Sequence, residues 1–239
     1  MDDVLKIVCI HRELESDLEL WNSLKRALSS AEGRYLLIVG SNERAARVSG
    51  CGEAVLKRPG MELIFSSERH RILFEAEIRT AGKKIIQNFT DAGIASVGVV
   101  GSDRGILKRD SSGNLRLSGI GSLIALTRSG VVSVLLTAGI DEAGKVIDIS
   151  PFHVAVIIDK LLHENIGKTK GQIVLLISKP TDSVMEKMVA GTEIEMHEVL
   201  DLLDGLPEEV CELTVLHPNG IRLLTPLKLG KAPGARVNP

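Results

Sequence analysis

The sequence predicts an α/β protein: a three-layer αβα sandwich with a mainly parallel central sheet. Short apolar segments rich in Val, Ile and Leu alternate with longer segments that have helical periodicity. Strands that are apolar on both faces and separated by helices are typical of a parallel sheet covered on both sides. Hydrophobic residues make up 44% of the chain but aromatic residues only 3%, so we expect aliphatic side chains to fill the space between the layers.

The first part of the chain predicts two strands, each followed by a helix. Val4–Ile10 and Tyr35–Val39 are continuous apolar runs of strand length. Leucines recur at helical spacing within Ser16–Ser30, and a short helix is expected over Asn42–Val48.

The longest predicted helix spans Ser66–Ala92, after an apolar approach over Met61–Phe65. Its first serine is a suitable N-cap, because a hydroxyl oxygen can accept from a free N–H of the first turn. Apolar residues then follow at spacings of three and four from Phe74 to Phe89. Gly93 can close the helix in a left-handed conformation.

The middle of the chain predicts two buried strands around a hairpin and a helix. Ile94–Val100 and Val131–Ala138 are strongly apolar. Ile106–Arg109 and Asn114–Leu117 are joined by a polar turn ending in glycine, as in a β-hairpin. Gly119–Ser129 is expected to be a helix.

The last part of the chain continues the alternation, after a turn over Asp141–Gly144. We expect a single domain, residues 1–239, made of an N-lobe (about 1–167) and a C-lobe (about 168–239). The last segment is expected to add an edge strand. The predicted elements, in chain order, are strand Val146–Ile149, helix Pro151–His163, strand Gln172–Ile177, helices Ser183–Ala190 and Glu195–Leu203, strand Glu212–Leu216 and edge strand Leu229–Val237.

Composition argues against several classes of protein. A net charge of -2 and few aromatic side chains do not suit a nucleic-acid-binding surface. Cys9, Cys51 and Cys211 are scattered without metal-knuckle spacing, so neither a disulfide framework nor a metal site is predicted. The longest apolar runs are about half a membrane span, and the first residues do not read as a signal peptide. We expect a cytoplasmic protein that binds neither membrane nor nucleic acid.

The segments AGIASVGVVGSDRG, GVVSVLLTAGIDEAGKVIDISPFHVAVIIDKLL and GQIVLLIS, with the hairpin between the first two, carry a resemblance. In order and spacing, from about Gly60 to Ile177, they resemble the amino-acid kinase family, N-acetylglutamate kinase and its relatives. The resemblance implies the acetylglutamate kinase-like fold, with the acyl substrate on the N-lobe and the nucleotide on the C-lobe. It also implies transfer of phosphate from ATP with Mg²⁺ to a carboxylate, and a homodimer formed around Ser66–Ala92.

Several positions depart from what the resemblance requires. Such kinases need glycine turns and lysines around the phosphates. Here the first turn, Cys9–Glu13, has neither, and the second keeps one glycine of three, Gly40. Glu62 replaces a substrate-binding arginine, Phe152 replaces a lysine-ordering aspartate, and Gly191–Glu195 is acidic where a late lysine is expected. The prediction is a pseudokinase that has lost carboxylate phosphorylation and serves as a metabolite-binding, regulatory or scaffolding protein.

Two alternatives remain open. One is an active acetylglutamate or acylamino-acid kinase of arginine- or lysine-type biosynthesis, using Arg12, Arg104 or Lys179 in place of the usual lysines, with ATP and Mg²⁺ as cofactor. The other is a protein that binds another phosphorylated or anionic metabolite at Gly40–Asn42 and Gly101–Gly105. In each case the expected partner is a small anionic metabolite or acylamino acid.

Candidate ligand residues gather at predicted strand ends and helix starts, and no catalytic residue can be assigned. The turn at Gly40 could hold an anion with backbone N–H groups, or it could be an ordinary Asn-capped turn. Arg104 could hold a carboxylate or phosphate at two points, or it could be a solvated hairpin arginine. The ligand- or phosphate-binding candidates are His11, Arg12, Gly40, Ser41, Asn42, Gly101, Ser102, Asp103, Arg104, Ser150, His153 and Lys179.

Overall fold

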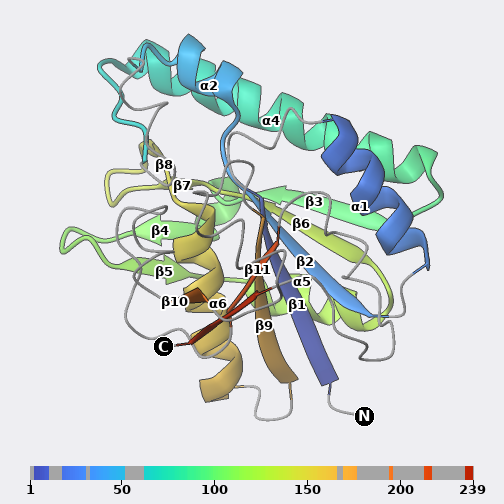
Figure 1. Cartoon of the computed structure of the whole chain (residues 1–239). Helices are drawn as coiled ribbons and strands as arrows, with labels where there is room; N and C mark the ends of the chain where they lie inside the picture. Colours follow the sequence, from blue (N-terminus) through green and yellow to red (C-terminus); the bar gives the residue numbers. More distant parts are fainter. Residues whose placement is uncertain are drawn as a thin grey trace.

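A central, mainly parallel sheet forms the middle layer of the computed structural model (Figure 1). The structure describes residues 3–10, 18–30, 33–51, 62–165, 169–176, 194–195, 213–216 and 235–238. Within these residues the sheet has eight strands in the order β10-β12-β11-β9-β1-β2-β6-β3. The strands are β1 (Asp3–Ile10), β2 (Arg34–Val39), β3 (Ser96–Val100), β6 (Val132–Leu136), β9 (Thr169–Leu176), β10 (Ile194–Glu195), β11 (Leu213–Leu216) and β12 (Ala235–Asn238).

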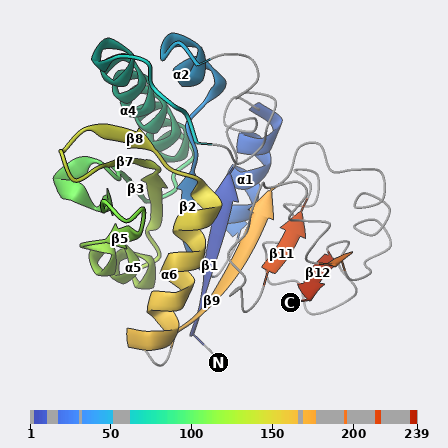
Figure 2. The ribbon, with the colours of Figure 1, turned by 90° about the vertical axis from the view of Figure 1, so that its left-hand side faces the viewer.

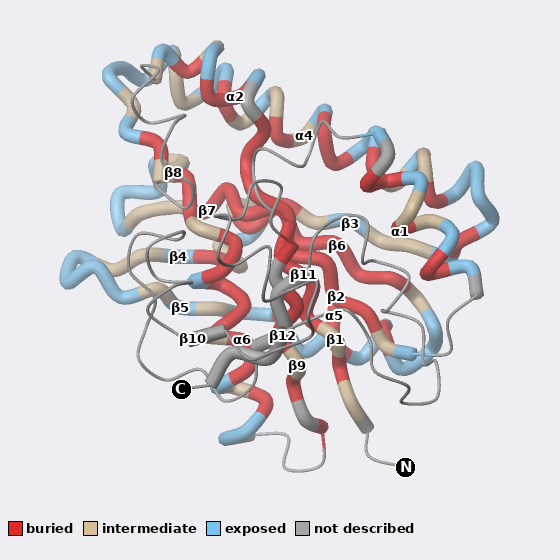
Figure 3. Tube along the Cα trace, viewed as in Figure 1, coloured by how far each residue is buried: buried red, intermediate tan, exposed pale blue. Residues whose placement is uncertain are grey.

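Helices cover both faces of this sheet, which confirms the predicted αβα sandwich (Figure 2). Alternate residues of β1 enter two separate cores, with Ile7 on one face and Val8 on the other. Figure 3 shows the buried residues concentrated in the central strands. The helices on the Val8 face are α1 (Leu18–Ser30), α2 (Glu43–Val48) and α4 (Glu68–Asp91), and those on the Ile7 face are α5 (Ile120–Arg128) and α6 (Pro151–Asn165).

A second sheet, in the order β5-β4-β7-β8, adjoins the ends of β3 and β6. The predicted hairpin is confirmed as the antiparallel pair β4 (Leu107–Arg109) and β5 (Leu115–Leu117). The predicted single strand Val131–Ala138 is wrong at its end, because β6 stops at Leu136 and Ala138 begins β7 (Ala138–Ile140), which pairs with β8 (Val146–Asp148). Within such a mostly apolar run, no sequence signal identifies the residue at which the chain passes from one sheet to the other.

The start of α4 differs from the prediction by one residue. Ser67, rather than Ser66, is the N-cap, and its hydroxyl accepts from the N–H of His70 at 3.3 Å. The hydroxyl of Ser66 lies 2.7 Å from Nδ1 of the same histidine. Two adjacent serines are equivalent in sequence, so the pattern could not choose between them. At the other end Gly93 has φ 72°, the left-handed conformation expected after a helix.

The C-terminal strands are arranged differently from the prediction. The end of the segment expected at the sheet edge, from Ala235, forms β12, which lies between β11 and β10, antiparallel to β11. The edge strand β10 has only two residues, too few to leave a sequence pattern. It includes Glu195, the first residue of the predicted helix Glu195–Leu203. The rest of that helix and Ser183–Ala190 lie outside the described residues. In the described part of the chain, no helix is both long and apolar enough to cross a bilayer.

Candidate functional site

The ends of neighbouring parallel strands form a continuous row at the carboxyl edge of the central sheet. The N–H of Gly40 donates to the carbonyl of Ile10 at the end of β1 (3.0 Å), and the N–H of Gly101 donates to Leu136 at the end of β6 (2.8 Å). Val39, the last residue of β2, pairs in register with Leu136. Open α/β sheets usually bind ligands at this edge. Two candidate glycines from distant segments therefore lie along the edge at which such sheets usually bind ligands.

The turn after β2 uses its asparagine to start a helix. The Asn42 carboxamide oxygen accepts from the N–H of Ala45 at 2.6 Å and so caps α2. Ser41 and Asn42 are both buried. The side chain of Asn42 is therefore engaged within the protein, and any anion held at Gly40–Asn42 would be bound by backbone groups.

The loop after β3 is tied to helix α4 by charged side chains. Asp103 accepts from the N–H of Val100 (3.2 Å) and pairs with Arg79 of α4 (2.8 Å). Glu75 also pairs with Arg79 (2.7 Å) and accepts from the hydroxyl of Ser102 (3.3 Å). Hydrogen bonds to Asp103 and Glu75 raise the pKa of Arg79 above its ordinary value. Two candidate residues, Ser102 and Asp103, thus contribute to anchoring the loop on the helix.

Arg104 is the one candidate in this loop whose side chain extends into solvent. Its φ of 52° makes it the only non-glycine residue with positive φ in the described part of the chain. The left-handed conformation costs an ordinary residue roughly 1 kcal/mol. Its guanidinium makes no hydrogen bond or ion pair among the described residues, so it is available to a ligand from solution.

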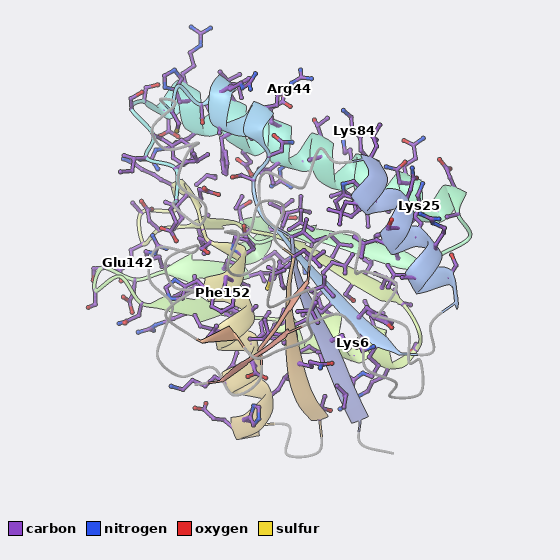
Figure 4. The ribbon with its side chains drawn as sticks, in the orientation of Figure 1. Lys6, Lys25, Arg44, Lys84, Glu142 and Phe152 are labelled. Carbon is purple, nitrogen blue, oxygen red and sulfur yellow. The ribbon has the colours of Figure 1, made fainter. Side chains whose placement is uncertain are left out.

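The start of α6 meets the same edge of the sheet. The N–H of Ile149 donates to the carbonyl of Thr137, the residue after β6, at 3.0 Å. Ser150 therefore lies beside the strand ends, and His153, one turn into the helix, is exposed. Phe152 is only 3% exposed and belongs to the core beneath α6 (Figure 4). The position that the resemblance assigned to an ordering aspartate is filled by an inward apolar ring.

A charge cluster that the sequence did not predict as a unit lies next to this helix start. Nη1 of Arg109 donates to Oε2 of Glu62 (2.6 Å), and Nη2 pairs with Oε1. The N–H of Ser150 donates to the same Oε1 at 3.4 Å. The buried carboxylate of Asp148 accepts from the N–H of Leu63 at 2.9 Å. Hydrogen bonding to Glu62, followed by the charge of Asp148, raises the pKa of Arg109, although burial opposes this.

Sequence reasoning recognised Glu62 as a charge reversal but did not identify Arg109 as its partner. The available signal was weak: Arg109 follows Leu107 by two residues on a strand, so both project from the same side. Leu107 is fully buried, which indicates that Arg109 faces inward as well. The two charged residues are 47 positions apart in the chain, and only the fold brings them together.

Three of the candidate residues cannot be located in the described part of the structure. His11, Arg12 and Lys179 lie outside the described residues. Lys6 lies within β1 and not in the first turn, where the resemblance requires a lysine (Figure 4). Its ammonium is 5.4 Å from the centroid of the Tyr35 ring. Burial lowers the pKa of Lys6. Among the described residues, no three His, Cys, Asp or Glu side chains are grouped to hold a metal ion.

No protein-family model matches the chain, and no curated protein matches it in sequence. Solved structures do match. Isopentenyl phosphate kinase from T. acidophilum has a TM-score of 0.58 at 12% identity, over 98% of this chain and 99% of its own. Aspartokinase III from E. coli, in complex with aspartate and ADP, has a TM-score of 0.61 at 12% identity, over 98% of this chain and 64% of its own.

A third match is N-acetylglutamate synthase from Neisseria gonorrhoeae, complexed with coenzyme A and L-arginine. Its TM-score is 0.61 at 13% identity, over 99% of this chain and 61% of its own. This chain therefore spans less than two thirds of the aspartokinase and synthase chains but nearly all of isopentenyl phosphate kinase. These structures share the amino-acid kinase fold, and the likeness confirms that fold for this chain. At such low identity it establishes the fold alone.

Proposed function

We propose that this chain is an amino-acid kinase-fold protein that binds a small anionic metabolite without transferring phosphate. It would act as a metabolite-binding, regulatory or scaffolding protein in the cytoplasm. The observation that carries the proposal is the pairing of Glu62 with Arg109 beside the start of α6. The resemblance implies a substrate-binding arginine at position 62, whereas this chain has a carboxylate there, which occupies Arg109 until a ligand displaces it.

Two further features support the absence of phosphoryl transfer. Gly40, Gly101 and Thr137, the residues that follow β2, β3 and β6, are uncharged. Phe152 replaces a polar group at the start of α6 with a buried ring. Phosphoryl transfer is accelerated almost entirely by positioning and charge stabilisation, and the residues directly after these three strands supply no cation.

The first prediction concerns nucleotide. We expect calorimetry with ATP and Mg²⁺ to detect no saturable binding at millimolar nucleotide. We also expect turnover with acetylglutamate, aspartate or isopentenyl phosphate below about 0.01 s⁻¹, against the 1–100 s⁻¹ typical of kinases. A cooperative thermal unfolding transition in the same sample serves as the control for a folded protein. Micromolar ATP binding together with faster turnover of any of the three acceptors would refute the proposal.

The second candidate function is an active small-molecule kinase that uses ATP with Mg²⁺. The match to isopentenyl phosphate kinase favours it, since the two structures align over 98% of this chain and 99% of that enzyme. The exposed His153 and Arg104 would then contact the phosphates, with His11, Arg12 and Lys179. Its acceptor would be an acylamino acid, as in acetylglutamate kinase, or a phosphorylated metabolite. Turnover of acetylglutamate would indicate the first, and turnover of isopentenyl phosphate the second.

We also propose that the protein is a homodimer joined through α4 and β3. β3 ends the described sheet and leaves its outer backbone groups unpaired there. A groove of about 600 Å³ is lined by the second half of α4 and by β3, with Ile86 of α4 beside Gly98 of β3. Lys83 and Asp91 also line the groove. Two-fold symmetry would bring the lysine of one copy opposite the aspartate of the other.

The second prediction tests this dimer. Light scattering at 10 µM concentration should give about twice the chain mass of 25.8 kDa for the unchanged protein, since an interface of this kind usually holds well below that concentration. Ile86→Lys should give the monomer mass, because it places an ammonium group in the groove. Ala125→Lys, on the exposed side of α5, is the control and should leave the mass unchanged. A monomer mass for the unchanged protein contradicts the proposal.

A further inference from the structure

Glu62 is held by the contacts that proteins use for a bound carboxylate. Its two oxygens accept from two different nitrogens of Arg109, and Oε1 also receives the N–H of Ser150 at 3.4 Å. A guanidinium presents two parallel N–H groups that match the two oxygens of a carboxylate. The donating groups come from β4 and from the start of α6, whereas Glu62 comes from a segment that belongs to neither element.

The backbone that carries the groups donating to Glu62 is positioned by the fold. Arg109 lies on β4, where it pairs in register with Leu115 of β5. The N–H of Ser150 belongs to the turn before α6, a helix of 15 residues whose N-terminus favours negative charge. Nε of Arg109 is also buried, without a hydrogen-bond partner in the described part of the chain. The backbone of Arg109 is thus held in place by the sheet, and its guanidinium still has an unused donor.

The carboxylate of Glu62 is the replaceable member. Its side chain is 27% exposed, and residues 62–65 are neither helix nor strand. The neighbouring backbone is anchored separately, because the N–H of Leu63 donates to Asp148 and the Leu63 side chain is buried. The glutamate side chain can therefore rotate into solvent while the main chain stays in place. About a quarter of the surface of each side chain in the pair is exposed, so a dissolved ligand can reach Arg109 and compete with Glu62 for it.

We propose that Arg109 and the N–H of Ser150 form a carboxylate-binding site that Glu62 occupies in the absence of ligand, and that a ligand carboxylate binds by displacing it. This rests on the proposed function only in placing the ligand at this edge of the sheet. It names the chemical class of the ligand and the residues that contact its acidic end. Arg109 recognises the carboxylate, and Glu62 sets the concentration at which a ligand can enter.

The third prediction uses acetate as the probe. In Glu62→Ala the vacated site should bind acetate, so that 100 mM sodium acetate raises the melting temperature by about 2 °C over sodium chloride of equal ionic strength, as mass action at a Kd near 20 mM implies. The unchanged protein should need at least five times more acetate for the same shift, because its own carboxylate competes. Adding Arg109→Lys to Glu62→Ala should abolish the response, because an ammonium lacks the two-point fork.

The control is Glu68→Ala, which removes the partner of Arg71 in an ion pair of 3.6 Å at the start of α4. That pair has a more exposed glutamate, and acetate should leave the variant's melting temperature unchanged. If Glu62→Ala is too unstable to melt cooperatively, Glu62→Gln replaces it, and the amide NMR signal of Ser150 should move on acetate addition. An equal response of Glu62→Ala and Glu68→Ala overturns the site, and a larger response to inorganic phosphate than to acetate overturns the carboxylate class. Neither outcome depends on ATP turnover, so this inference and the proposed function can fail separately.

Discussion

Gly101→Val is expected to destabilise the protein by about 4 kcal/mol or more, among the largest effects of a single substitution. A Cβ atom at this position would lie 2.7 Å from the carbonyl oxygen of Ala138 and 2.6 Å from Cγ of Leu107. The backbone cannot move away easily, because the N–H of Gly101 donates to Leu136 and its carbonyl accepts from Leu107, each at 2.8 Å. Urea unfolding, followed by the fluorescence of the buried Trp21, measures the loss.

Gly121→Ala is the matched control for this substitution. Gly121 lies in α5, its Cβ would meet nothing within 4 Å, and its φ is ordinary for a helix. Alanine there should stabilise the protein by up to about 1 kcal/mol, because glycine is the poorer helix former. A valine at Gly101 that costs no more than the roughly 0.5 kcal/mol of a surface change would mean that the two sheets do not meet as described.

Gly101 also has a packing role that sequence reasoning did not predict. Gly101 was predicted as a ligand residue because it follows a buried strand in a glycine-containing loop. The structure gives it a packing role, since it is where β3 and β6 meet the second sheet. Whether it also contacts a ligand stays a prediction. Glycines that permit close approach and glycines that admit a phosphate have the same appearance in a sequence.

The layers of the fold could be predicted because they depend on local patterns. Continuous apolar strands and helical periodicity identify α4 and the parallel strands of the central sheet. The transfer of the chain from β6 to β7 at Thr137 could not be predicted, because Val131–Ala138 is mostly apolar and threonine is itself common within strands. The position of β12 also escaped prediction, since it depends on the two-residue strand β10.

The candidate site was less predictable because it is made of distant pairs. The strand-end rule correctly brought Gly40 and Gly101 to one edge. It could not show that Asp103 would pair with Arg79 of α4, or that Arg109 would pair with Glu62. The sequence does not show which charged residues will pair in the fold. Whether a charged residue is available to a ligand depends on that pairing.

Asp148→Ala is expected to cost about 3 kcal/mol of unfolding free energy, because removing one member of a buried polar cluster leaves the others unsatisfied. The side chain is 3% exposed and accepts from the N–H of Leu63, which would lose its partner. Arg109 would also lose a nearby negative charge. Asp148→Asn keeps an acceptor for the N–H and should cost about half as much. Denaturant unfolding of both variants gives the comparison.

Asp141→Asn is the control, because Asp141 also accepts a backbone N–H, that of Lys145 at 2.8 Å, but lies on a partly exposed turn. It should cost less than about 1 kcal/mol. Equal losses for Asp148→Asn and Asp141→Asn would contradict a special role for the buried charge. Combined with Glu62→Ala, Asp148→Asn should strengthen acetate binding, because it removes a negative charge that repels the ligand. The same carboxylate thus stabilises the segment after residue 61 and weakens the binding of anions at Arg109, so its removal should lower stability while raising affinity.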